Sequence, residues 1–266
     1  KALEAVRDAW HNNSLERDVE REVLSTYGKQ LTQDDHRARV EFLLWTNQRT
    51  AASKLKYLLT SDYRKLVDAR IALAARSRNV DALVDAVPAN LQDNPGLLYE
   101  RAKWRRQKLR NQDVATPLLT GIDGNDIPEA GRSRLWDERN IAIRTDLKDG
   151  NWSRAYQLAS PHGMESGGDF AEAEWVSGWI ALRLKNDADR SLQHFETMSD
   201  GVSTPISLAR GKYWAGRARD ALGQPDAART DYTAAAEHKF TYYGQLAAER
   251  LDDKKLAFPK TSEPTA

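Results

Sequence analysis

The chain has 266 residues, and its formal net charge of +1 gives no excess of positive charge for nucleic acid or for a polybasic contact with a membrane. It contains no cysteine, which excludes disulfide bonds and thiolate metal sites. No apolar run approaches the roughly 20 residues that span a bilayer, so we expect no membrane-spanning segment.

Helical periodicity runs through almost the whole chain, without a convincing strand pattern. In the first half the spacing predicts a helix over 14–27 that ends at Gly28. Thr32 caps the next helix, with Asp35 completing a capping box. Further helices are expected over 50–59, 62–76, 80–87, 95–109 and 111–119.

After a loop over 121–128, the pattern predicts helices over 132–148 and 152–159, a second loop over 161–169, and helices over 170–184 and 187–198. Pro205 opens the next helical hairpin. The first helices of successive pairs begin near residues 32, 62, 95, 131, 170 and 205. A steady period of this length is typical of helical-repeat proteins.

Small and aromatic residues repeat within this pattern. Gly216, Ala228, Tyr232 and Ala235 fall at the offsets of a tetratricopeptide-type repeat. Trp175-x-x-Gly178 matches Tyr213-x-x-Gly216, and Phe195 matches Tyr232 after a slip of one residue. One such hairpin cannot bury its apolar face alone. We therefore predict an all-α solenoid, or superhelix, shaped as an open horseshoe or ring segment; a compact helical bundle is the alternative.

The residues offer no convincing catalytic, cofactor or metal site, and no phosphate loop, HExxH motif or nucleophile elbow is present. No pair of histidines, or of histidine and carboxylate, has the spacing of metal ligands, so we interpret the histidines as solvated or capping: His11, His36, His162, His194 and His238. Glu165-Ser166 resembles a glycosidase acid pair. A Gly-rich turn would leave Glu165 in water, where it could not act as a general acid.

Two residue types could contact a ligand. The eight tryptophans could stack on sugar rings, but packing between helices is the favoured interpretation. Trp179 and Trp214 lie near other Trp or Tyr residues in the sequence, so one ring of each cluster could face outward. Four arginines lie within otherwise apolar helical faces: Arg70, Arg183, Arg210 and Arg217. We expect ion pairs within the array, with an inner surface for anionic ligands as the alternative.

Several phrases together resemble the soluble lytic murein transglycosylases, in particular the alphaproteobacterial type. They are AYQLASPHG (155–163), AEAEWVSGWIALRL (171–184), HF (194–195), PISLARGKYWAGRARDALG (205–223) and YYGQLAAERL (242–251). LLW (43–45) and ARIAL (69–73) agree more loosely. The resemblance is strong from about residue 155 to 251 and weaker before.

The resemblance implies a periplasmic enzyme in which a superhelix holds a lysozyme-like domain. In the family that domain cleaves peptidoglycan glycan strands with one glutamate and leaves a 1,6-anhydro sugar. Here residues 1–251 would be the superhelix: a cap over 1–31, then about six hairpins and a last docking helix over 32–251.

Residues 252–266 would be a linker or tail, and the lysozyme-like domain is absent. We also read the start, which has no initiator Met, as processed or trimmed. We therefore expect an inactive scaffold portion whose partners are glycan strands and the missing domain, without nucleic acid or any cofactor. The alternative is a free-standing helical-repeat adaptor for proteins. An enzyme that uses Glu165 is a third and weaker hypothesis.

Overall fold

The computed structural model describes residues 1–110 and 112–252. Within this part every regular element is a helix, α1 to α15 with short 3-10 and π turns, and no strand is present. The fold prediction is therefore confirmed at the level of an all-α chain whose helices pack mainly on their neighbours in sequence. No described helix combines the length and apolar character needed to cross a membrane.

The chain divides into two compact units, and unit 1 comprises residues 1–145 with 161–164. Its helices are α1 (Ala2–Asn12), α2 (Arg17–Tyr27), α3 (Gln33–Trp45), α4 (Arg49–Leu55), α5 (Ser61–Ala74), α6 (Val80–Asp85), α7 (Pro95–Trp104), α8 (Gln112–Thr120) and most of α9 (Glu129–Lys148). Contacts join α1 to α3, α3 to α4, α5 to α6 and α7, and α7 to α8. Leu43, Leu66 and Leu97 are fully buried in the core that these helices share.

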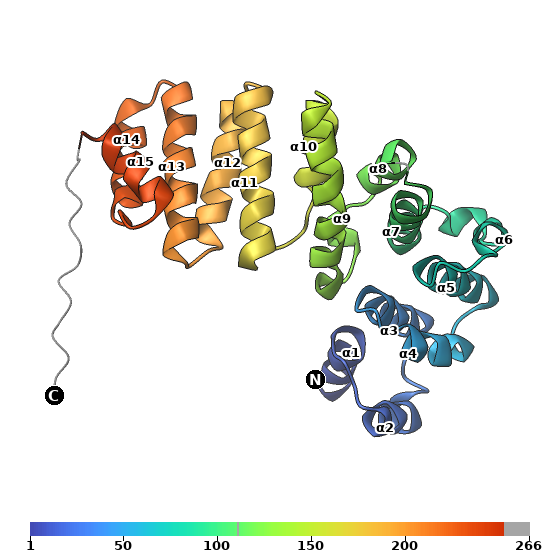
Figure 1. The fold of residues 1–266 in the computed structure, drawn as a ribbon. Helices are drawn as coiled ribbons and strands as arrows, with labels where there is room; N and C mark the ends of the chain where they lie inside the picture. Colours follow the sequence, from blue (N-terminus) through green and yellow to red (C-terminus); the bar gives the residue numbers. More distant parts are fainter. Residues whose placement is uncertain (111, 253–266) are drawn as a thin grey trace, which may run out of the picture. The chain divides into compact units, whose positions relative to one another are not determined.

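The described part of unit 2 comprises residues 146–160 and 165–252. Its helices are α10 (Trp152–Ala159), α11 (Gly167–Leu184), α12 (Ala188–Asp200), α13 (Pro205–Ala221), α14 (Pro225–Ala236) and α15 (Tyr242–Arg250). Figure 1 shows α11, α12 and α13 side by side in chain order, followed by α14 and α15, and each of these helices packs on the next. In addition α11 contacts α13, and α13 contacts α15, so the odd-numbered helices adjoin one another.

Polar caps determine where several helices begin. The side chain of Thr32 accepts a hydrogen bond from the Asp35 N–H, and Asp35 accepts one from the Thr32 N–H, which confirms the predicted capping box. The side chains of Thr204 and Thr241 each accept one backbone N–H bond and so cap α13 and α15, without the reciprocal bond of a capping box. A cap of this kind stabilises a helix by about 1 kcal/mol. Because caps are local, the sequence predicts these starts well.

The same glycine–aromatic contact builds two successive hairpins. A Cβ added to Gly178 of α11 would lie 2.7 Å from a ring carbon of Phe195 of α12, and one added to Gly216 of α13 would lie 2.7 Å from the ring of Tyr232 of α14. Only glycine lets each ring lie this close to the helix backbone. The predicted equivalence of these two hairpins at this contact is therefore confirmed.

The first helices of the six predicted pairs begin within three residues of the expected positions, at Gln33, Ser61, Pro95, Glu129, Gly167 and Pro205. Several helix boundaries differ from the prediction. The return helix over 50–59 ends in a 3-10 turn at Lys56–Leu58, and the helix over 95–109 ends in a π turn at Arg105–Leu109. The helix predicted from residue 170 already begins at Gly167, because glycines are tolerated in an exposed first turn. Of the predicted tail, only Asp252 lies within the described residues.

Candidate functional site

The eight tryptophans differ in burial, and this decides which of them a ligand can reach. Three are almost completely buried in unit 1: Trp10, Trp45 and Trp136. Four are half-buried: Trp104, Trp175, Trp179 and Trp214. Trp152 is 44% exposed and was not singled out by the sequence. Apart from Trp104, the accessible rings all belong to unit 2.

Aromatic and arginine side chains gather on the three adjoining helices of unit 2. We call this group the aromatic–arginine row, which comprises Trp175 and Trp179 of α11, Arg210, Tyr213, Trp214 and Arg217 of α13, and Tyr243 of α15. The ring of Trp175 lies 6.5 Å from Trp179 and 6.4 Å from Trp214, between centroids. The Trp214 ring lies 6.5 Å from that of Tyr243. These are ordinary distances for interacting rings, so the row is continuous from α11 to α15.

The arginines of the row pack on its rings. The guanidinium carbon of Arg210 lies 5.1 Å from the Trp175 ring centroid, and that of Arg217 lies 5.7 Å from the Trp214 centroid. Neither forms an ion pair with another described residue, although the sequence favoured ion pairs. Burial lowers the pKa of Arg210, while Tyr243 and Glu172 act in the opposite direction. Both arginines remain charged, since a guanidinium does not lose its proton in a protein.

The other two arginines singled out by the sequence lie elsewhere. Arg70 forms the expected ion pair, with its Nη1 2.5 Å from Glu41 Oε2 in unit 1. Arg183 is exposed on α11 and makes no ion pair with a described residue. The ion-pair expectation is thus confirmed for Arg70, whereas Arg210 and Arg217 contact rings.

Three N–H donors in the row have no acceptor among the described residues: Trp175 Nε1, Trp214 Nε1 and Arg210 Nε. A buried donor without an acceptor costs about 1–3 kcal/mol, so such groups are rare in folded proteins. Such donors also occur in unit 1, on Trp10, Trp104 and Trp136 among others, so the three of the row do not by themselves identify a ligand site.

Two small hollows accompany these aromatic residues in unit 2. One of about 340 Å³ is lined by Tyr213 of the row together with Leu246, Glu249 and Arg250. The other, of about 320 Å³, surrounds the exposed Trp152 with small polar groups from Gly150 to Arg154. Each combines an aromatic ring with hydrogen-bonding groups, the composition that suits a sugar unit.

Glu165 lies exposed in the segment that precedes α11. An exposed carboxyl lacks the apolar surroundings in which a carboxyl acts as a general acid near neutral pH. The structure therefore places Glu165 in the environment that the sequence predicts for it.

The interpretation of the histidines as solvated or capping is wrong for most of them. His36 and His162 are buried. His11 Nε2 lies 2.9 Å from Asp35 Oδ1, and His194 Nδ1 lies 2.5 Å from Glu174 Oε2. The sequence cannot indicate these pairs, because the partners lie on different helices. His194 Nε2 also contacts the Tyr156 hydroxyl at 2.8 Å, which ties α10, α11 and α12 together.

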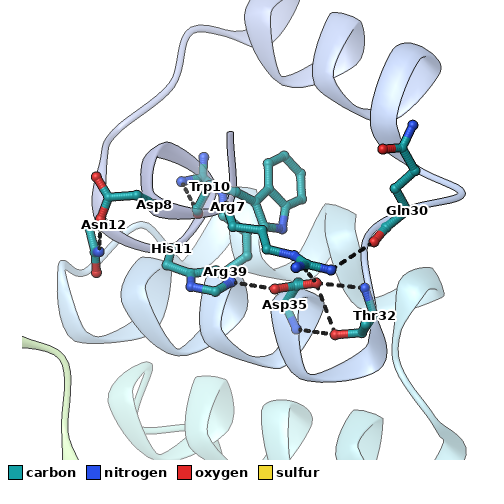
Figure 2. Close-up of polar contacts among 9 residues, drawn as sticks. All are labelled: Arg7, Asp8, Trp10, His11, Asn12, Gln30, Thr32, Asp35 and Arg39. Carbon is teal, nitrogen blue, oxygen red and sulfur yellow. Dashed lines mark hydrogen bonds and ion pairs between the residues drawn. The ribbon is translucent and has the colours of Figure 1, made fainter. Parts of the chain in front are cut away.

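Asp35 is the centre of the densest polar cluster in unit 1 (Figure 2). Its carboxylate accepts from the Thr32 N–H at 2.7 Å and from Arg7 Nε at 3.2 Å, and it contacts His11. Arg39 of the same helix donates to the carbonyl oxygens of Trp10 and Asn13. Both oxygens of Asp35 are thus engaged by protein groups, which identifies the cluster as a clasp that holds α1 on α3.

Neither metal chemistry nor a known relative identifies this site. The described residues contain no group of His, Asp or Glu side chains that could hold a metal ion. Comparison of the chain with protein-family models, with curated proteins and with solved structures found no match. The aromatic–arginine row is therefore the candidate site on its geometry alone.

Proposed function

We propose that this chain is the superhelical, non-catalytic portion of a periplasmic lytic transglycosylase and that it engages peptidoglycan glycan strands through the aromatic–arginine row. The observation that carries the proposal is the row itself. It presents half-buried tryptophan rings and two arginines without ion pairs on adjoining helices of unit 2.

The chemistry of the row suits a glycan with acidic substituents. Flat apolar rings pack against the faces of pyranose rings. The indole and guanidinium N–H groups donate to hydroxyl, ether and carboxylate oxygens. The planar guanidinium can form two parallel hydrogen bonds with one carboxylate. A glycan strand that carries carboxylates supplies all of these partners.

We further propose that the hairpins form a superhelix, as an open horseshoe or ring segment. The repeated glycine–aromatic contact of two hairpins supports this, as do the contacts of α11 with α13 and of α13 with α15. In a superhelix of this kind the first helices of the pairs would line one surface. The row would then extend along that surface.

In this proposal a lysozyme-like domain in the parent protein supplies the catalysis, and α15 is the helix on which it docks. The support is the resemblance of residues 155–163, 171–184, 205–223 and 242–251, which lie largely on α10, α11, α13 and α15. The open reading frame that encodes the chain provides the test. We expect it to encode a lysozyme-like domain after Leu251, and a frame without one would overturn this part of the proposal.

Binding to the glycan is tested by sedimenting the chain with insoluble peptidoglycan. We expect the chain to sediment, and Trp179→Ala and Arg217→Gln each to lower the bound fraction. Tyr57→Ala is the matched control, because Tyr57 is a 66% exposed aromatic residue of unit 1 outside the row. Equal binding by all variants would exclude the row as the contact.

A helical-repeat adaptor is the second candidate function. It is favoured by three large apolar side chains that are exposed at the starts of α13 and α15: Ile206, Phe240 and Tyr242, at 67%, 65% and 69%. An adaptor would bind a protein through these residues. Loss of a protein complex in Ile206→Ser and Tyr242→Ser, with glycan binding absent from the unaltered chain, would favour the adaptor over the glycan scaffold.

A further inference from the structure

A groove between α4 and α5 in unit 1 has no role in the function proposed above. Its volume is about 590 Å³, which is within the range of small-molecule sites. Four polar residues of α4 line it, Arg49, Thr50, Ser53 and Lys54, and they face Ile71 of α5 and Ala75 at its end. Positions i, i+1, i+4 and i+5 share one side of a helix, so these polar groups point into the same space.

The polar side chains of the groove are all hydrogen-bond donors. Arg49 and Lys54 form no ion pair, and Thr50 and Ser53 no side-chain hydrogen bond, with any residue in the described part of the chain. Some other cations of unit 1 form ion pairs: Arg39 with Glu20, Lys56 with Asp68 and Arg106 with Glu138. The lining of the groove contains two cations and no carboxylate.

The nearby carboxylates do not compensate this charge. Glu41 is taken by Arg70 at 2.5 Å. Arg49 acts on the carboxyl of Glu100 together with Arg70, Arg134 and Lys103, while burial of this carboxyl raises its pKa. Arg134 and Lys103 bond instead to a backbone carbonyl and to the Tyr99 hydroxyl. Among the lining residues themselves, Arg49 and Lys54 are therefore two cations without a carboxylate partner.

We propose that the groove binds a small molecule with several anionic oxygens, of the phosphate or carboxylate type. Arg49 and Lys54 pair with the oxygens, and Thr50 and Ser53 donate hydrogen bonds to them. Ile71 and Ala75 form an apolar side against which a short carbon segment of the ligand rests. This site is independent of the aromatic–arginine row, since it lies in unit 1 and uses charge rather than rings.

The test is a titration of the isotope-labelled chain, followed by the backbone amide signals in NMR. Pyrophosphate is the probe for phosphate ligands and citrate the probe for carboxylate ligands, with sodium chloride at equal ionic strength as the control for screening. We expect saturable shifts centred on Thr50, Ser53 and Ile71 with at least one of the two anions. Whichever anion binds more tightly assigns the class. Shifts that do not saturate, or that chloride reproduces, would overturn the proposal.

Variants locate the binding. Arg49→Gln and Lys54→Gln should each weaken the affinity about tenfold or more, since each removes a charge-assisted contact. Lys29→Gln, an exposed cation elsewhere in unit 1, should leave the affinity unchanged. Because neither Arg49 nor Lys54 forms an ion pair or a side-chain hydrogen bond with a described residue, both variants should fold, and amide spectra without the anion verify this. Ser53→Ala provides a second variant that keeps the charge and should weaken binding by less. Unchanged affinity in both Arg49→Gln and Lys54→Gln would contradict the site.

Discussion

At Asp35, burial and hydrogen bonding act on the carboxyl in opposite directions. Burial alone raises its pKa, but the bonds from Thr32 and His11 and the charge of Arg7 together bring the pKa below its usual value. The folded state thus favours the ionised form of Asp35 more than the unfolded state does. It stabilises the fold above the unfolded pKa of about 4, and this contribution is lost as the pH falls through the folded pKa.

We predict that Asp35→Asn lowers the free energy of unfolding by about 1–3 kcal/mol at neutral pH and flattens its decline below about pH 4. Urea unfolding at neutral and acid pH measures both effects. Asp34→Asn is the matched control, because the Asp34 side chain is 86% exposed. If Asp34→Asn and Asp35→Asn behave alike, the clasp between α1 and α3 does not contribute to stability.

His36, next to Asp35, should act in a higher pH range. Burial of the His36 ring lowers its pKa. The negative charge of Asp35 acts in the opposite direction, but the net shift is downward. The folded state therefore holds fewer protons than the unfolded state just below the unfolded pKa of about 6.5, so stability declines as the pH falls from there. We expect His36→Gln to reduce the loss of stability between about pH 7.5 and 5.5. His238→Gln, in unit 2, should leave that loss unchanged; if His36→Gln does so too, His36 is not the group responsible.

At the scale of the helical element, we expect Gly→Ala to have opposite effects on stability at two glycines of unit 2. In Gly216→Ala the new methyl group meets the Tyr232 ring at 2.7 Å, so we expect a loss of about 1–3 kcal/mol in stability. In Gly168→Ala the methyl group enters open space in the first turn of α11, and we expect a gain of about 0.4–1 kcal/mol. Thermal unfolding of both variants checks the prediction. A gain in Gly216→Ala would mean that the hairpin does not close on this contact.

The elements also show how far the sequence predicts the structure. The cap formed by Thr32 and Asp35 was predicted, because it depends on residues close in sequence. The glycine–aromatic contacts were predicted because they recur at a fixed offset. The partners of His194 and Arg70 are 20 and 29 residues away, on other helices, and no local pattern indicates them. Trp179 and Trp214 were identified as candidates for an outward face, whereas the continuity of the row required the packing of α11, α13 and α15.

At the scale of the whole molecule, the proposed superhelix predicts an extended particle. A compact globule of 266 residues would have a radius of gyration of about 18 Å. We expect small-angle X-ray scattering to give a clearly larger value, with a distance distribution skewed towards long separations. A value near that of the globule, with a symmetric distribution, would favour the compact bundle.

Contact between the aromatic–arginine row and glycan is the basis of the proposed function. Its most direct test is the NMR shift of the indole N–H signals when soluble glycan strands are added to the isotope-labelled chain. The row predicts saturable shifts for Trp175, Trp179 and Trp214. The buried Trp10, Trp45 and Trp136 should not respond. Glycan binding that leaves the three signals of the row unmoved, or no binding at all, would contradict the account.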